Sequence, residues 1–308
     1  MLEIYQKTIS EPIKFEGIGL HSGRISKIRV LPGQEDQGIS FKRIDLKENN
    51  LIVAKYYNVS SAKLCTTLIN EHGAKVSTVE HLLAALYISE IDNAIIEIDN
   101  EEVPIMDGSA KDFLDILAKI KTRTLTKKRK YLKILDNVEL KDGERKISIE
   151  PSNSSFEVYF QLDYKNKVIG KQKNLVNFSR DNLQQITESR TFCLYEDIEK
   201  IKKAGLAKGG SLENAIVVDD DKVLNEGGLR NKSEFVNHKI LDLAGDFLLS
   251  GFRVLGKVTC HQGGHELTNK FLRKLLNSKS AISSIELKDN IIGKKQISDQ
   301  SIKIAVNA

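Results

Sequence analysis

A histidine and two aspartates recur every four residues in the stretch SEFVNHKILDLAGDF, residues 233–247. On a helix, His238, Asp242 and Asp246 fall on one side together with Lys239, and the apolar residues fall on the opposite side. Charged stripes of this kind usually face water, so one interpretation is a solvated surface. Histidine and aspartate at i and i+4 can also bind one cation together. A third ligand and a general base elsewhere in the chain would decide in favour of a metal site.

The pentapeptide STVEH, residues 77–81, places a glutamate directly before a histidine. Ser77 and Glu80 have the spacing of a capping box, in which both side chains bind backbone donors at the start of a helix. A glutamate beside a metal-binding histidine is also where a hydrolytic zinc site needs its general base, close enough to take a proton from water. One carboxylate cannot easily serve both purposes, so both interpretations of Glu80 stay open.

The two halves of the chain show a similar order of elements, which indicates how these residues come together. In each half we predict a helix, a strand, a turn and a second helix. These segments span residues 77–117 and 234–276. His81 and His238 lie near the starts of the first helices, and Gly108 and Gly264 precede the closing helices. Two units of one design, packed about an approximate twofold axis, would bring the two histidines together and supply the third ligand.

Strand-like segments precede the helices in each half. Their apolar and polar residues alternate, as in half-buried antiparallel strands. We predict an α+β fold of two domains with similar topology, each a mainly antiparallel sheet packed against helices. The basic stretch 121–130 has no regular periodicity, so we interpret it as a linker. The predicted domains are residues 1–124 and 125–308, with a small β-α-β insert at about residues 193–220 of the second.

The composition is that of a globular protein with a substantial core. Of 308 residues, 40% are apolar and 29% are charged. No run approaches the length of a transmembrane helix and the first residues do not resemble a signal peptide, so we expect a cytoplasmic location. The three cysteines form no CxxC pair, which argues against a disulfide framework. Basic residues are interspersed with 42 acidic ones, so we expect no nucleic-acid partner.

Several longer motifs resemble one enzyme family. In chain order they are GIGLHSG, STVEHLLAAL, VPIMDGSA, RTF, GGSLENAIVVDD, VLNEGGLRNKSEFVNHKILDLAGD and GGHELTNK. They look like the UDP-3-O-acyl-N-acetylglucosamine deacetylase family of Gram-negative bacteria, zinc amidases that catalyse the committed step of lipid A synthesis. The resemblance covers essentially the whole chain. It implies two domains of similar topology with the active site between them.

The resemblance also implies roles for the residues of the paired helices. It makes His81, His238 and Asp242 the ligands of a catalytic zinc, and this ligand set also accepts ferrous iron. Three protein ligands leave a fourth position for water. Glu80 is then the general base, and His265 is the acid that protonates the leaving amine.

Two further residues would assist these groups. Asp246 would hydrogen-bond to His265, raising the pKa of that histidine and fixing its tautomer. Thr191 would donate a hydrogen bond to the developing oxyanion.

The remaining implied residues contact the substrate, a UDP-linked acylated amino sugar. Phe192 would pack against the sugar, Lys239 would contact the diphosphate, and Tyr164 could stack on uracil. Either Arg145 or Lys146 would contact phosphate, and the motifs do not choose between them. The implied acyl-chain passage is lined by Ile198, Gly210, Ala215 and Val217. We expect a monomer that binds this small molecule.

Overall fold

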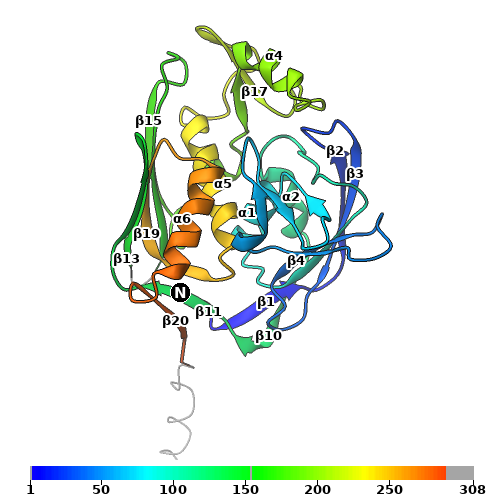
Figure 1. The fold of residues 1–308 in the computed structure, drawn as a ribbon, viewed down its shortest axis with the longest axis vertical. Coiled ribbons are helices and arrows are strands. Elements are labelled where there is room, and N and C mark those ends of the chain that lie inside the picture. The colour runs from blue at the N-terminus through cyan, green and yellow to red at the C-terminus, as the bar shows by residue number, and fades with distance from the viewer. Residues whose placement is uncertain (1, 153–154, 289–308) are drawn as a thin grey trace, which may run out of the picture.

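A computed structural model of the chain describes residues 2–152 and 155–288. Two β-sheets enclose a layer of helices, in which α1 (Glu80–Ile88) and α5 (Glu234–Leu248) pack against each other (Figure 1). The same layer contains α2 (Lys111–Leu117) beside α1 and α6 (His265–Asn277) beside α5. This arrangement confirms the predicted α+β class.

The two sheets share one strand order. In each, a central strand has an antiparallel neighbour on one side and a parallel neighbour on the other side of the order given below. The first sheet runs β2 (Ile13–Ile18), β3 (Ile25–Pro32), β9 (Ala94–Ile98), β4 (Ile39–Arg43), β5 (Leu51–Val53). The second runs β12 (Val138–Asp142), β13 (Arg145–Pro151), β19 (Arg253–His261), β14 (Phe156–Asp163), β15 (Lys171–Asn177). Since β9 follows α1 and β19 follows α5, the two units have the same topology, as predicted.

Each unit adds one further antiparallel strand pair. In the first, β1 (Tyr5–Ile9) pairs with β10 (Thr122–Lys128) as a separate two-stranded sheet. In the second, β11 (Lys130–Ile134) pairs with β20 (Ile282–Glu286) and also lies parallel to β19, so both strands extend the second sheet. The prediction of an irregular linker at residues 121–130 is therefore wrong. Most side chains of β10 are exposed, so this strand lacks the alternation that marks a half-buried one.

The proposed domain boundary between residues 124 and 125 lies within β10. The end of the second predicted domain, residues 289–308, lies outside the described residues.

The predicted β-α-β insert is present and projects beyond the helical layer (Figure 1). Its strands β16 and β17 are parallel, and β18 adds an antiparallel third strand. Its elements are β16 (Phe192–Leu194), α4 (Tyr195–Lys203), β17 (Ile216–Asp219) and β18 (Lys222–Val223). The remaining short elements are η1 (Tyr56–Asn58), β6 (Val59–Ser61), β7 (Thr67–Ile69), β8 (Lys75–Val76) and α3 (Gln184–Thr187).

Helix α5 is buried on both sides. Of its residues only Lys239 is not buried, because α1 covers one side and the second sheet and α6 cover the others. Its polar stripe therefore faces another helix, and the interpretation of that stripe as a solvated surface is wrong. Buried polar side chains need partners, so this stripe requires a chemical explanation.

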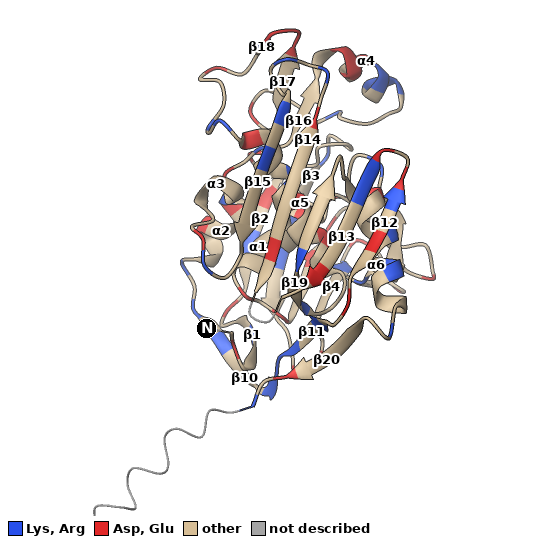
Figure 2. Ribbon diagram, turned by 90° about the vertical axis from the view of Figure 1, so that its left-hand side faces the viewer, with Lys and Arg blue, Asp and Glu red and all other residues tan. Residues whose placement is uncertain are grey.

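Strands β12 and β13 of the second sheet carry both signs of charge. Basic and acidic residues both occur on β12 and β13 (Figure 2), where Lys146 forms an ion pair with Glu139 at 2.6 Å. Such a mixture does not form a basic surface on these strands. Within the described part of the chain, every helix is too short or too polar to cross a bilayer.

Candidate metal centre

Small residues set how closely α1 and α5 approach. A Cβ added at Gly245 would lie 2.1 Å from the backbone oxygen of Glu80 and 3.1 Å from the backbone nitrogen of Ala84. Only glycine fits at this crossing unless the helices separate. The close approach places the first turn of α1 beside the middle of α5. Polar side chains from both helices then meet in one buried space.

The predicted metal ligands meet there. Nε2 of His81 lies 3.4 Å from Oδ1 of Asp242, and Nε2 of His238 lies 3.3 Å from the same oxygen. One ligand atom from each residue lies within 4.8 Å of the other two, and all three residues are buried. The internal repeat thus brings together a histidine from α1 with a histidine and an aspartate from α5.

The chemistry of these donors fits a divalent cation. Oδ1 of Asp242 is buried and lacks a hydrogen-bond partner among the described residues, although both histidine nitrogens face it. Nδ1 of His238 lies 3.1 Å from the carbonyl oxygen of Ser189. If this nitrogen donates its proton there, Nε2 presents a lone pair toward Asp242. Such an arrangement is typical of histidine ligands to zinc.

The protonation states of the ligands agree with this interpretation. Burial lowers the pKa of His238 to about 3, so its ring is neutral at physiological pH. Burial alone would raise the pKa of Asp242, but the cationic side chains of Lys239 and His265 hold it well below its usual range. A neutral imidazole and an ionised carboxylate are the forms that bind metals.

An acid and a base lie beside the triad. Nε2 of His265, at the start of α6, lies 3.8 Å from Oε1 of Glu80 and 3.8 Å from Oδ2 of Asp242. Its Nδ1 lies 2.8 Å from Oδ2 of Asp246. Burial alone would lower the pKa of His265, but the carboxylates of Asp246, Asp242 and Glu80 raise it to about 10. Burial also raises the pKa of Glu80.

The structure excludes one of the two interpretations of Glu80. Helix α1 begins at Glu80, and its N-terminus has no side-chain cap. The hydroxyl of Ser77 donates instead to the carbonyl of Glu101 at 3.2 Å. The capping box is therefore not formed, and the Glu80 carboxylate is free to face the site.

Thr66 is a site residue that the sequence did not indicate. Its backbone N–H donates to Oε2 of Glu80 at 3.0 Å, and its hydroxyl donates to Oδ1 of Asp246 at 2.7 Å. Thr66 thus holds both the carboxylate of Glu80, beside the metal ligands, and the carboxylate of Asp246, which binds His265. Thr66 precedes β7, far from α5 in sequence, and no motif marks it.

Lys239 and two aromatic residues form one wall of the site. Nζ of Lys239 donates to Oδ2 of Asp242 at 2.9 Å and lies 5.5 Å from the ring centre of Phe192. Phe192 also packs edge-on against Tyr164, with ring centres 5.9 Å apart, and lies 6.3 Å from the ring of His238. The structure therefore places Phe192, Lys239 and Tyr164 together beside the metal ligands.

An apolar cavity of about 330 Å³ opens from this wall into the insert. Thr191 and Phe192 line the cavity, and His21 contributes from the first unit. All four residues of the implied acyl-chain passage line it as well: Ile198, Gly210, Ala215 and Val217. Residues brought together only by the fold of the insert thus form one continuous apolar surface.

The structure leaves the choice between Arg145 and Lys146 open. Arg145 forms an ion pair with Asp142 at 2.6 Å, and Lys146 forms one with Glu139 at 2.6 Å. Both lie on β13, and neither lines the apolar cavity.

Comparison with known proteins agrees with this geometry. The model of the family described as UDP-3-O-acyl N-acetylglycosamine deacetylase (LpxC) matches residues 6–277, which include the triad, Glu80, Asp246 and His265. The chain belongs to this family. The match confirms the resemblance seen in the motifs.

Curated relatives carry the name UDP-3-O-acyl-N-acetylglucosamine deacetylase. A deacetylase of Geotalea uraniireducens (strain Rf4) is 41% identical over 284 residues, which cover 92% of this chain and 92% of the relative. One from Shewanella violacea is 40% identical, covering 90% of this chain and 92% of the relative. One from Pasteurella multocida is 40% identical, covering 93% and 94%.

Proposed function

We propose that this chain is a metal-dependent amidase that removes the N-acetyl group from UDP-3-O-acyl-N-acetylglucosamine. Acetate is released, and the reaction is the committed step of lipid A synthesis. The observation that carries the proposal is the buried triad of His81, His238 and Asp242, with Glu80 and His265 beside it. Membership of the deacetylase family supports the substrate.

We propose zinc as the metal, with ferrous iron as the alternative ion for the same ligands. The cation would polarise the acetamide carbonyl and lower the pKa of a water molecule. His81 and His238 would bind it through Nε2, since both of these nitrogens face Oδ1 of Asp242. Lys239 donates to the other oxygen of Asp242 and so orients this ligand.

Glu80 and His265 divide the proton transfers between them. Glu80 would take a proton from the attacking water, with its other oxygen held by the N–H of Thr66. His265 would give a proton to the amine, which leaves poorly until it is protonated. Because Nδ1 of His265 is bound to Asp246, the mobile proton is on Nε2, the nitrogen that faces Glu80.

The wall and the apolar cavity would hold the rest of the substrate. Thr191 lines the mouth of the cavity next to Phe192, and we propose that its hydroxyl donates to the developing oxyanion. Phe192 would pack on the sugar, Tyr164 would stack on uracil, and Lys239 would contact the diphosphate. The fatty chain would occupy the cavity lined by Ile198, Gly210, Ala215 and Val217.

We also propose that the two structural units act as domains 1–124 and 125–308, with the reaction at the contact of α1 and α5. Each of these helices supplies at least one ligand, so the site needs both units of one chain. A monomer would therefore suffice. The cytoplasmic location stays a prediction.

The direct test is acetate release from the UDP-linked acylated substrate by purified protein of known metal content. Chelation should abolish release, and one equivalent of zinc should restore it. His238→Gln should lose metal and activity, whereas the matched control His72→Gln, on an exposed turn, should keep both. Full activity in metal-free protein would overturn the mechanism, and failure of metal-loaded protein to release acetate would overturn the substrate.

A further inference from the structure

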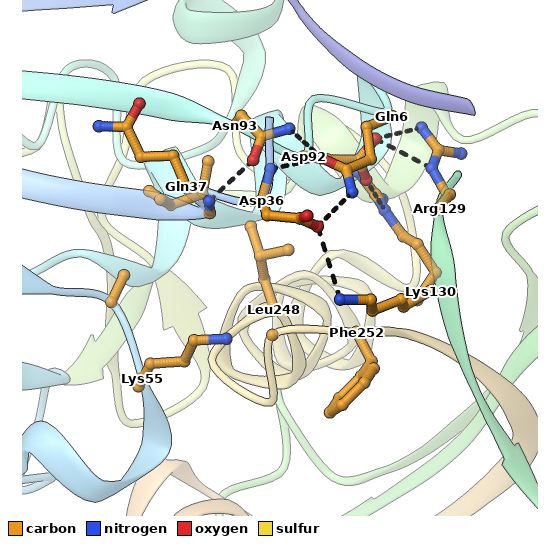
Figure 3. A pocket seen from close by; sticks show the side chains of 15 residues that line it. Gln6, Asp36, Gln37, Lys55, Asp92, Asn93, Arg129, Lys130, Leu248 and Phe252 are labelled. Carbon is orange, nitrogen blue, oxygen red and sulfur yellow. Dashed lines mark hydrogen bonds and ion pairs between the residues drawn. The ribbon is translucent and has the colours of Figure 1, made fainter. Parts of the chain in front are cut away.

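A second cavity, of about 260 Å³, lies between the two units, away from the metal centre. It is formed where the turn after α5 meets the start of β11 and the loop after β5 (Figure 3). Leu248, at the end of α5, lines it, and this residue lies about 15 Å along the helix from His238, at about 1.5 Å per residue. None of the metal-binding triad lines this cavity.

The lining of this cavity has an excess of positive charge. Its four cationic side chains outnumber its two carboxylates, and they are Lys55, Arg129, Lys130 and Arg253, against Asp36 and Asp92. Arg129 and Arg253 both bind Asp92, at 2.7 Å and 3.2 Å. Lys130 lies 3.5 Å from Asp36. Both carboxylates are therefore already engaged.

Lys55 is the cation without a partner. Among the described residues, neither a carboxylate nor a hydrogen-bond acceptor contacts its ammonium group. The carbonyls at the end of α5 are used by the backbone: Leu248 accepts from Gly251, and Leu249 accepts from Tyr56, both at 2.9 Å. Burial lowers the pKa of Lys55, as expected for an ammonium group that has lost water and gained no anion.

The ammonium group of Lys55 lies against the backbone of Gly251. A Cβ added at Gly251 would lie 1.7 Å from Nζ of Lys55, so the ammonium lies directly against the glycine. In Figure 3 the side chains of Lys55 and Lys130 extend toward each other from opposite sides of the cavity. Two ammonium groups on opposite sides of a polar space are suited to bind one anion between them.

We propose that this cavity binds a phosphate group between Lys55 and Lys130. The two surplus positive charges of the lining match a phosphate dianion better than a monocarboxylate. The phosphate could be free or part of a small phosphate ester, because the cavity volume accommodates either. This binding would be independent of the deacetylation site.

Calorimetric titration of the metal-loaded protein at constant ionic strength would test the proposal, with inorganic phosphate and glycerol 3-phosphate as probes. We expect binding to the native protein and binding about tenfold weaker or worse to Lys55→Met, since charged hydrogen bonds are the strong ones. The matched control Lys14→Met, at an exposed lysine of β2, should bind like the native protein. Comparing the two probes shows whether the site prefers free phosphate or an ester.

Thermal unfolding separates lost binding from misfolding. Without phosphate, Lys55→Met should unfold at the same temperature as the native protein or a higher one, because the substitution removes an uncompensated cation. Added phosphate should raise the unfolding temperature of the native protein and of Lys14→Met, but not that of Lys55→Met. Absence of phosphate binding by the native protein would overturn the proposal. Equal binding by Lys55→Met, or loss of binding only in Lys239→Met, would place the phosphate elsewhere and also overturn it.

Discussion

Gly245 of α5 lies against the backbone carbonyl of Glu80, at the first residue of α1. The space left for a side chain at Gly245 is so small that a Cβ would lie 2.1 Å from this oxygen. The contact joins the two units at the place where each contributes polar groups to the metal centre. The spacing between His81 and the ligands of α5 therefore depends on one glycine.

Gly245→Ala should consequently damage the metal centre as well as the fold. Separating two packed helices to admit one methyl group costs about 1–3 kcal/mol of unfolding free energy. It should also weaken metal affinity, since His81 moves away from His238 and Asp242. Denaturant unfolding and competition with a metal indicator would measure the two effects.

Gly143→Ala is the control for this variant. Gly143 lies between β12 and β13 at φ +62°, where an added Cβ would have open space around it. This substitution should cost stability through backbone strain but leave metal affinity unchanged. Equal metal affinity in native protein and Gly245→Ala would show that the helix contact does not set the ligand spacing.

The pairing of His81 with His238 could be predicted because the repeat that creates it is visible in local sequence patterns. Each histidine lies near the start of a helix that is followed by a strand and a glycine turn, and the structure shows the same order in both units. The burial of the polar stripe on α5 could not be predicted from the helix alone. It depends on α1, whose closeness depends on Gly245.

Three other structural features could not be predicted from the sequence, each for a physical reason. Strand β10 is exposed on most of its residues, so no alternation of apolar residues marks it. The capping box considered for Ser77 and Glu80 is not formed, because the Ser77 hydroxyl donates to the carbonyl of Glu101, a tertiary partner. Thr66 acts through Asp246, which is 180 residues away, and such a contact leaves no local signal.

Glu80→Gln should separate catalysis from structure. The amide oxygen of glutamine can still accept from the N–H of Thr66, so the fold and the metal content should be kept. Without a carboxylate to take the proton from water, turnover should fall by about 10² to 10⁴. Acetate release at saturating substrate, together with metal analysis, would measure both. A variant with near-native turnover would exclude Glu80 as the base.

Thr66→Val should reduce turnover although Thr66 does not touch the metal ligands. The change removes the hydroxyl that donates to Asp246 and leaves the backbone donor to Glu80 in place. Loss of this donor leaves a buried carboxylate oxygen unsatisfied, which should lower the unfolding free energy by about 1–3 kcal/mol. We also expect turnover to fall while the Michaelis constant changes little, because Thr66 positions the acid–base residues and not the substrate.

Thr66→Ser is the matched variant, because it restores the hydroxyl without the methyl group. It should recover most of the turnover lost in Thr66→Val. If Thr66→Ser keeps the low turnover of Thr66→Val although its hydroxyl can still donate to Asp246, the hydrogen bond to Asp246 has no positioning role.

The pH dependence of kcat/KM should be bell-shaped, because Glu80 must be ionised while His265 is protonated. Burial raises the pKa of Glu80 above its usual 4.5, so activity should appear on the acidic side above that value. The pKa of His265 is raised from 6.5 to about 10, so the imidazolium persists, and activity should fall only on the basic side of neutrality. Both limbs belong to the coupled site and not to single residues.

Asp246→Asn should shift the basic limb of this profile. His265 loses the carboxylate 2.8 Å from its Nδ1, so its imidazolium is less stable and deprotonates at lower pH. The basic limb should therefore move to lower pH, and the acidic limb should move much less. Asp115→Asn, an exposed aspartate of α2 that pairs only with Lys111 among the described residues, should leave both limbs in place. A basic limb that stays fixed in Asp246→Asn, and also in His265→Ala, would mean that another group donates the proton to the leaving amine.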